Sequence, residues 1–455
     1  MILARLDRLP ATRHIWQMVM LLSLGGMFEF YDLFMTAYVV PGLAKAGLLK
    51  ELTIWVFSGP AVFVSATFLG LFIGTFAFGS VADRFGRRFI FTCSMLFYCA
   101  ATLIMAFQNT GWGVCFWRMV AGIGIGVELV TIDAYVAELV PARIRGRAFA
   151  LNQTVQFSVV PVVAFIAFKL VPLQPLGWDG WRWVVAIGAL GALFVWFLRR
   201  AIPESPRWLV THRRFAEATA ITAAIEDRVS ADLNGAPLPP PNAHHAVDNL
   251  SGRGTFSEIW QSPYGGRTIM LMVFQFFQTF GFYGFAAWVP TLIAQQAGIK
   301  LGDSLLYSFI IAIAAPFGPL LAMTFADKFE RKWQLVGAAC CIGIFGVTFS
   351  YQNTMPLLIL CGVLITLSNN VLSYSFHNYQ SELFPTRIRA RAVGFTYSLS
   401  RISTVFASFI IAFFLQEAGT KGVFGLIAFA MAMVVISISG WGPRTRDLEL
   451  EQVSA

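Results

Sequence analysis

The feature that most constrains this chain is an internal repeat with one fixed offset. Residues 79–88 (GSVADRFGRR) recur in altered form at residues 323–332 (MTFADKFERK), and residues 138–147 (ELVPARIRGR) recur at residues 382–391 (ELFPTRIRAR). Both copies are displaced by the same 244 residues. Two independent landmarks with one displacement predict that the chain contains two copies of one unit, each roughly half its length.

The chain is too apolar for an ordinary soluble protein. Hydrophobic residues make up 57% of it and charged residues only 13%, against about 25% charged residues in typical globular domains. Crossing about 30 Å of hydrocarbon takes about 20 apolar residues in a helix. We expect an all-α membrane protein with twelve transmembrane helices in two six-helix bundles related by the repeat. The expected spans are 17–41, 57–81, 89–109, 112–137, 149–172, 181–199, 268–295, 304–326, 333–352, 355–381, 392–416 and 421–441.

The basic residues indicate the topology of these spans. The net charge is +9, and 25 of the 33 Lys and Arg fall in alternate connecting segments if the N-terminus starts inside. Cytoplasmic loops carry such an excess of Lys and Arg. We therefore expect a multi-pass protein of a bacterial-type inner membrane with both termini in the cytoplasm. The positive charge then reports topology, and no nucleic-acid partner is expected.

The long polar segment in the middle joins the two copies. We expect an N-terminal bundle at 1–200, a cytoplasmic linker with a short amphipathic helix at 201–267, and a C-terminal bundle at 268–455. The linker holds the pair His244-His245, but two adjacent histidines without further ligands do not make a metal site. No nucleotide-binding motif or soluble catalytic domain is recognisable. We expect no enzyme activity, no metal and no cofactor.

The first loop motif carries a family resemblance. Residues 79–88 resemble the signature loop between helices two and three of the major facilitator superfamily, and the weaker copy at 327–328 lies where that superfamily has one. Residues 203–209 (PESPRWL) are similar to the sugar-porter branch and its relatives, including organic-ion transporters. The resemblance covers essentially the whole chain. It implies two bundles and transport by alternating access, usually as a monomer.

The repeated acidic and basic residues at the helix ends are predicted to form a cytoplasmic gate. A carboxylate followed by arginines can cap a neighbouring helix and pair across the bundle interface, as a latch that breaks when this side opens. The alternative is that these residues only anchor the helices at the headgroups. The expected gate residues are Asp83, Arg84, Arg87, Arg88, Glu138, Arg143, Asp327, Arg331, Glu382 and Arg387.

Ionisable side chains inside spans are costly and are functional candidates. Asp32 lies roughly 14 Å and Arg118 roughly 9 Å from the outer ends of their spans at 1.5 Å per residue. We expect Asp32 to carry a proton and Arg118 to be its partner, because protonation removes the charge that holds such a pair together. A permanent pair that only fixes packing is the alternative. Glu29 and Glu128 are further candidates for proton coupling.

Arg401 is the best clue to the charge of a substrate. It lies roughly 15 Å deep in its span. In this respect the chain resembles organic anion transporters, which carry an arginine at this position. Its planar fork suits a carboxylate, although pairing with Glu29 or Glu128 is an alternative. Residues 29–32 (EFYD) also resemble the acidic motif of aromatic acid/proton symporters, which begins Asp-Gly. We expect the substrate to meet Arg401, Gln275, Gln278, Tyr283, Asn370, Tyr374, His377 and Asn378.

These residues favour a secondary transporter that moves a small organic anion together with a proton. An aromatic or related monocarboxylate is the expected substrate. A sugar or polyol/proton symporter and an organic cation transporter are the alternatives. A membrane sensor would need a larger soluble domain, and a membrane enzyme would need a clustered catalytic group.

Overall fold

The computed structural model describes residues 2–52, 58–78, 84–141, 144–199, 202–240, 256–325, 328–384 and 386–445. In a bilayer every backbone N–H and C=O must be satisfied within the protein, and long apolar runs achieve this as helices. The N-terminal half contains α1 (Ile2–Asp7), α2 (Arg13–Lys45), α3 (Gly59–Phe78), α5 (Arg87–Ala106), α6 (Gly111–Leu139), α7 (Arg145–Leu170) and α8 (Gly180–Arg199). The short helices η1 (Lys50–Leu52) and η3 (Pro175–Gly177) lie in its loops.

The connecting segment and the C-terminal half are helical as well. The connecting segment contains α9 (Pro206–Thr211), α10 (Phe215–Asp232) and η6 (Phe256–Trp260). The C-terminal half contains α11 (Tyr264–Ala286), α12 (Val289–Ala297), α13 (Leu301–Ala312), α14 (Phe317–Phe325), α15 (Arg331–Tyr351), α16 (Met355–Glu382) and α17 (Thr386–Trp441).

Each of the twelve predicted spans coincides with a helix or a pair of helices. Within the described ranges, ten helical segments are long and apolar enough to cross a membrane. One of them, α17, contains two predicted spans, and α8 corresponds to the remaining one. The expectation of an all-α membrane protein with twelve spans is confirmed.

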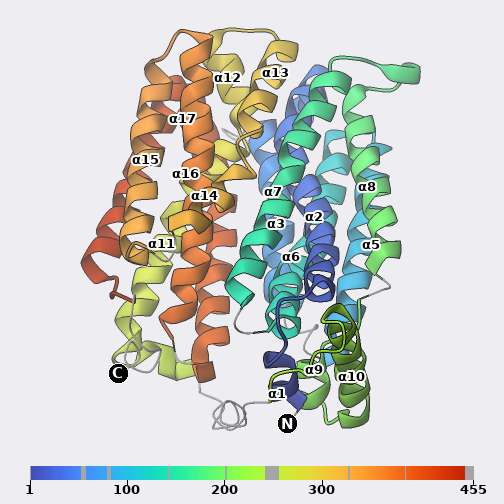
Figure 1. The fold of residues 1–455 in the computed structure, drawn as a ribbon. Coiled ribbons are helices and arrows are strands. Elements are labelled where there is room, and N and C mark those ends of the chain that lie inside the picture. Colours follow the sequence, from blue (N-terminus) through green and yellow to red (C-terminus); the bar gives the residue numbers. More distant parts are fainter. Residues whose placement is uncertain are drawn as a thin grey trace.

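The helices gather in two groups, each around its own apolar core. In Figure 1, α2 to α8 form one side of the molecule and α11 to α17 form the other. One core is built almost entirely from residues of the C-terminal half. The other two large clusters are built mainly from the N-terminal half. Substrate in such an architecture binds where the two groups face each other.

Two of the spans in the C-terminal half are interrupted. Residues 287–288 separate α11 from α12, and residues 313–316 separate α13 from α14. Pro290 and Pro316 lie at these breaks, and proline lacks the N–H that a continuous helix needs. Asn370 of α16 donates from Nδ2 to the carbonyl oxygen of Ala315 at 2.7 Å. The second break is therefore stabilised by a side chain from the neighbouring helix.

The two halves meet tightly at one end of the interface. Leu305, Ala312 and Ala315 of the C-terminal half belong to the apolar core of the N-terminal half. The rings of Phe165 in α7 and Phe309 in α13 have centroids 5.3 Å apart. This end lies opposite α1, α9 and α10, which share the other end of the molecule (Figure 1). We call the end with α1, α9 and α10 the terminal side and the opposite end the far side.

Candidate substrate and proton site

A buried ion pair joins α2 to α6 in the N-terminal half. Arg118 donates from Nη1 to Oδ2 of Asp32 at 2.8 Å and from Nη2 to the Asp32 carbonyl oxygen at 2.5 Å. The side chains are 0% and 4% exposed, respectively. Thr36 and Thr67 accept further hydrogen bonds from Arg118, and Thr102 donates to Oδ1 of Asp32 at 3.1 Å.

This arrangement brings together the two residues predicted to handle the proton. Breaking a buried pair by neutralising one partner is expensive, about 3–5 kcal/mol, because it leaves a charge without compensation. Protonating Asp32 would leave the buried Arg118 in that state. The N-terminal half would then have to rearrange or admit water, which is how a proton can be coupled to movement.

Arg401 of α17 is also buried, but its hydrogen-bond partners are neutral. Its Nη1 donates to the hydroxyl of Tyr283 and its Nη2 to the hydroxyl of Tyr397, both at 2.7 Å. Its guanidinium carbon lies 4.8 Å from the ring centroid of Tyr397. The residue is only 1% exposed, and within the described part of the chain its Nε has no hydrogen-bond partner. Glu29 acts on it electrostatically.

Arg401 lines a cavity between the two halves, which we call the central cavity. It has an empty volume of about 830 Å³. Four of the predicted substrate residues line it: Gln278, Tyr283, His377 and Arg401. Its other lining residues are Phe30, Leu33, Phe34, Leu129, Gln153, Gln156, Phe157, Phe274, Phe282, Leu372, Ser373, Phe376, Tyr397 and Ser400. One cation, three glutamines and many aromatic rings thus face one space.

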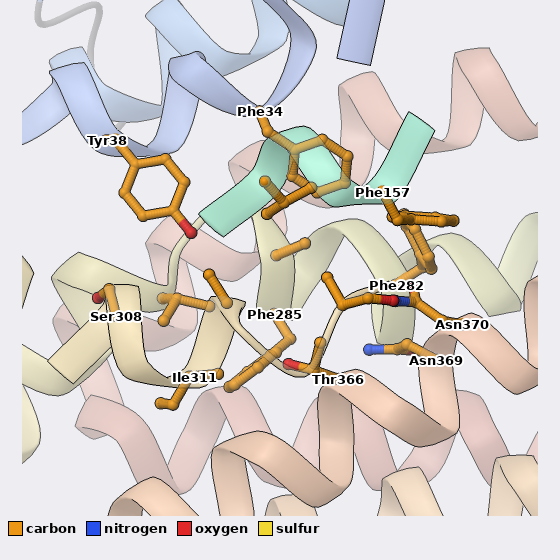
Figure 2. Close-up of a pocket in the computed structure, with 15 residues that line it drawn as sticks. Phe34, Tyr38, Phe157, Phe282, Phe285, Ser308, Ile311, Thr366, Asn369 and Asn370 are labelled. Carbon is orange, nitrogen blue, oxygen red and sulfur yellow. The ribbon is translucent and has the colours of Figure 1, made fainter. Parts of the chain in front are cut away.

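The other four predicted substrate residues lie elsewhere. Gln275 is fully buried behind the cavity wall, where its Oε1 accepts from Gln278 at 3.4 Å. Asn370 lines a separate cavity nearer the far side (Figure 2). Tyr374 and Asn378 line a third cavity near the terminal side. The stripe of Asn370, Tyr374 and Asn378 on α16 thus spans two cavities, because 1.5 Å per residue carries it past the central one.

The third cavity is the largest, and we call it the vestibule. Its empty volume is about 1800 Å³. It is lined by residues near the terminal-side ends of α2, α7, α14, α15 and α16, namely Trp16, Ile144, Gly146, Arg147, Leu151, Leu320, Met323, Arg331, Tyr374 and Asn378. The halves therefore separate at the terminal side while they stay in contact at the far side.

Glu29 and Glu128 are both fully buried. Neither belongs to the described lining of the central cavity. Their carboxylates lie in α2 and α6, the same two helices that hold Asp32 and Arg118.

Sequence reasoning did not identify several residues that complete these sites. Tyr397 lies four residues before Arg401, and Thr36 lies four residues after Asp32. Residues four apart share one face of a helix, so this spacing was the available signal. Thr67 and Thr102 come from α3 and α5, and no pattern in the sequence indicated their proximity to the pair.

The predicted gate residues form equivalent ion pairs in the two halves. Arg87 at the start of α5 contacts Glu138 at the end of α6, with Nη2 and Oε1 3.0 Å apart. Arg331 at the start of α15 contacts Glu382 at the end of α16. The residues of the second pair are those of the first pair shifted by the 244 residues of the internal repeat. Both described pairs lie within one half, and a latch across the interface remains a prediction.

Glu204, in the motif that resembled sugar porters, organises the start of α5. Its carboxylate accepts from the backbone N–H of Arg87 at 3.0 Å and of Arg88 at 3.2 Å. A carboxylate at a helix N-terminus satisfies N–H groups that have no partner within the helix. Arg88 is exposed, and Arg84 is exposed with its guanidinium 5.5 Å from the Phe85 ring.

Other predicted gate residues cannot be placed. Asp83, Arg143 and Asp327 lie outside the described residues, as does the side chain of Arg387. In the part of the chain that the structure describes, no group of three or more His, Cys, Asp or Glu side chains is arranged to hold a metal ion.

Comparison with known proteins places this chain among membrane transporters. The profile of a family described as sugar (and other) transporter matches residues 18–455. The chain is 32% identical to a protein of Escherichia coli named "Putative metabolite transport protein YdjK", over 99% of this chain and 96% of that protein. It is 26% identical to the niacin transporter NiaP of Acinetobacter baylyi, over 99% of each.

A solved structure has the same fold. The inward-open xylose transporter XylE of Escherichia coli superimposes with a TM-score of 0.74, covering 96% of this chain and 99% of that one at 21% identity. At 21% identity, this similarity shows that the two proteins share a fold, that is, the arrangement of their helices.

Proposed function

Because this chain belongs to the sugar (and other) transporter family of the major facilitator superfamily, we propose that it carries a small organic anion across the membrane together with a proton. It is a transport protein and not an enzyme. An aromatic or related monocarboxylate fits the central cavity best.

The main support for the proposal is a buried arginine, Arg401, in the wall of the central cavity. Its hydrogen-bond partners Tyr283 and Tyr397 are neutral, so its charge is not cancelled by a direct ion pair in the way that Asp32 cancels Arg118. An arginine presents a planar fork that matches a carboxylate. The aromatic rings of the cavity offer flat surface to the body of such a substrate.

Asp32 and Arg118 support proton coupling. The pair is separated from the lining of the central cavity, so a proton on Asp32 does not compete directly with a substrate on Arg401. Protonation would instead weaken the contact between α2 and α6 and thereby change how the N-terminal half moves. The Arg87–Glu138 and Arg331–Glu382 pairs sit where a latch between the halves would form when the vestibule closes.

A sugar/proton symporter is the second candidate. Gln153, Gln156 and Gln278 line the central cavity, and amides are suitable donors and acceptors for sugar hydroxyls. The xylose transporter that shares the fold has a sugar substrate by its name, whereas the relative named as a niacin transporter points to an aromatic acid. An organic cation is disfavoured by Arg401 in the cavity wall.

We further propose that the protein works as a monomer in the cytoplasmic membrane with its terminal side in the cytoplasm. The excess of Lys and Arg in alternate connecting segments supports this orientation. The structure would then be in an inward-facing state, because the vestibule lies at the terminal side. We also propose that the chain divides into an N-terminal bundle at 1–200, a cytoplasmic linker at 201–267 and a C-terminal bundle at 268–455.

The proposal can be tested by uptake into proteoliposomes with and without an inward proton gradient. Radiolabelled nicotinate, benzoate, xylose and choline would represent aromatic acids, sugars and cations. We expect the two acids to accumulate when the gradient is present. Arg401→Gln should weaken their binding about ten- to a hundredfold, the effect of losing a charge-assisted hydrogen bond, whereas Arg401→Lys should be intermediate.

Lys169→Gln provides the matched control. Lys169 is an exposed cation near the far-side end of α7 that stacks on Phe168, so its loss removes one charge from a span without touching the cavity. Accumulation of xylose alone, unaffected by Arg401→Lys, would replace the anion proposal by the sugar proposal. Accumulation of choline would refute both.

A further inference from the structure

A second cavity lies beyond the central one, towards the far side. We call it the far cavity; it has an empty volume of about 440 Å³ and is lined by residues from both halves. Figure 2 shows Phe34 and Tyr38 of α2 and Phe157 of α7 facing Phe282, Ser308, Thr366 and Asn369 of the C-terminal half. Among its described lining residues none is charged.

Three phenylalanines separate the two cavities. Phe34, Phe157 and Phe282 line both the central and the far cavity. The ring centroids are 6.1 Å apart for Phe34 and Phe157 and 6.4 Å apart for Phe157 and Phe282. Because Phe282 belongs to the other half, this Phe barrier spans the interface. It can open when the two halves move apart at this point.

The three cavities follow one another along the interface between the halves. The vestibule is lined by the terminal-side ends of the helices, the central cavity contains Arg401, and the far cavity reaches Ala312 and Val289 near the far side. A solute that crosses between the halves has to pass all three. The far cavity therefore lies on the path of the substrate.

Asn369 provides a binding group in the far cavity. It is 3% exposed, and its Oδ1 has no hydrogen-bond partner among the residues that the structure describes. Its Nδ2 makes only a long contact, 3.4 Å, with the carbonyl oxygen of Gly281. Its neighbour Asn370 differs, because its amide is held by Ala315 at 2.7 Å. Buried polar atoms almost always have partners, so a buried amide oxygen without one indicates a place for a ligand group.

We propose that the far cavity is a second substrate station, on the far side of the Phe barrier. It takes the planar ring of the organic anion, and Asn369 recognises a polar atom of that ring. The absence of a cation in its lining makes it weaker than the central site, as suits a place of entry or release. The inference rests on the proposed function, because it assumes an aromatic anion as the substrate.

The first test fills the far cavity. Ala312→Phe places a ring in it, and Ile313→Phe places one on the adjacent position, which is 44% exposed and does not line the cavity. We expect Ala312→Phe to bind nicotinate at the central site like the wild type. Its transport of nicotinate should fall at least about tenfold, because overfilled interfaces cannot relax freely, while Ile313→Phe transports normally.

The second test separates a binding role from a packing role. Asn369→Leu keeps the size of the side chain and removes its amide. Nicotinate and benzoate differ only in the ring nitrogen, so the ratio of their transport rates reports recognition of that atom. We expect this ratio to fall about three- to tenfold, the value of one hydrogen bond, with binding at the central site unchanged.

The outcomes are distinguishable. If the wild type binds neither acid, the proposed function fails and the second station falls with it. If the wild type binds and transports both acids, the second station is refuted by normal transport in Ala312→Phe. It is equally refuted by an unchanged nicotinate-to-benzoate ratio in Asn369→Leu.

Discussion

Two buried arginines illustrate how neighbours decide what a residue can do. Arg118 contacts the carboxylate of Asp32, so its charge is compensated, and the role proposed for the pair is proton coupling. Arg401 contacts two tyrosine hydroxyls on the wall of a cavity, and the role proposed for it is to bind the anionic group of the substrate. The residue type is the same in both positions, and the different proposed roles follow from the different partners.

Asp32→Asn is expected to remove the dependence of uptake on the proton gradient. The substituted amide cannot take up or release a proton, and Arg118 keeps a polar neighbour of the same shape. Uptake of labelled substrate, measured with and without an imposed gradient, would show the change. Asp179→Asn serves as control, since Asp179 pairs with Arg182 in a far-side loop. Gradient-driven accumulation by Asp32→Asn would show that another group carries the proton.

At the scale of helices, the repeat is visible as repeated contacts. The Arg87–Glu138 pair joins α5 to α6, and the Arg331–Glu382 pair joins α15 to α16. The two halves diverge at the breaks: α11/α12 and α13/α14 are interrupted, whereas α2 and α3 are continuous. The C-terminal half thus has helix breaks next to the far cavity that α2 and α3 do not have.

The turn inside α17 depends on Gly419. Its φ of 63° and ψ of −158° lie in a region that only glycine adopts readily. Gly419→Ala should therefore lower the free energy of unfolding by about 1–3 kcal/mol, seen as a lower Tm in detergent. Gly425→Ala, in the helix just beyond, has open space around its Cβ position and should leave Tm nearly unchanged. Equal Tm values for the two variants would contradict this account.

The docking of α1 on α10 is predicted to depend on pH. Arg5 and Arg8 both bond the carboxylate of Glu226. Burial raises the pKa of Glu226, but the hydrogen bonds and charges of the two arginines outweigh it and hold the pKa below its ordinary value. A lowered pKa in the docked state stabilises docking above the ordinary pKa of glutamate. This stabilisation is lost as pH falls through the lowered value.

Spin labels on Leu3 and Ala224 would measure this docking. The distance distribution should be narrow at neutral pH and broad in strong acid. Glu226→Gln should be broad at both pH values, because the amide lacks the charge that the arginines bind. A narrow distribution for Glu226→Gln at neutral pH would mean that apolar contacts alone hold α1 in place.

At the scale of the whole molecule, the three cavities differ in their access to water. The vestibule opens between helix ends at the terminal side, whereas contacts between α7 and α13 close the far side. We expect a cysteine at Asn378, in the vestibule, to react with a polar maleimide much faster than one at Ser308, in the far cavity. Detergent-solubilised protein with its six native cysteines replaced by alanine would be used. Equal rates would show that the far side is open in the resting protein.

The sequence by itself determined the architecture of this protein. The lengths of the spans follow from the local requirement that a helix in lipid be apolar and about 20 residues long. The division into two similar halves was readable from the 244-residue repeat, because both copies are written in the sequence itself. The Asp32–Arg118 pair was also predictable, because buried opposite charges at similar depth have few other partners. Arg401 was a candidate from its depth in the span and from the resemblance to organic anion transporters, and the structure places it in a cavity wall.

Only the tertiary structure decided how the polar residues divide among cavities. Helical spacing placed Asn370, Tyr374 and Asn378 on one face of α16, but that face passes the far cavity and the vestibule. Which cavity a residue lines depends on where the opposing half makes contact, and the opposing residues are hundreds of positions away. The Phe barrier of Phe34, Phe157 and Phe282 arises in the same way. It exists only because three distant helices bring their rings together at one level of the interface.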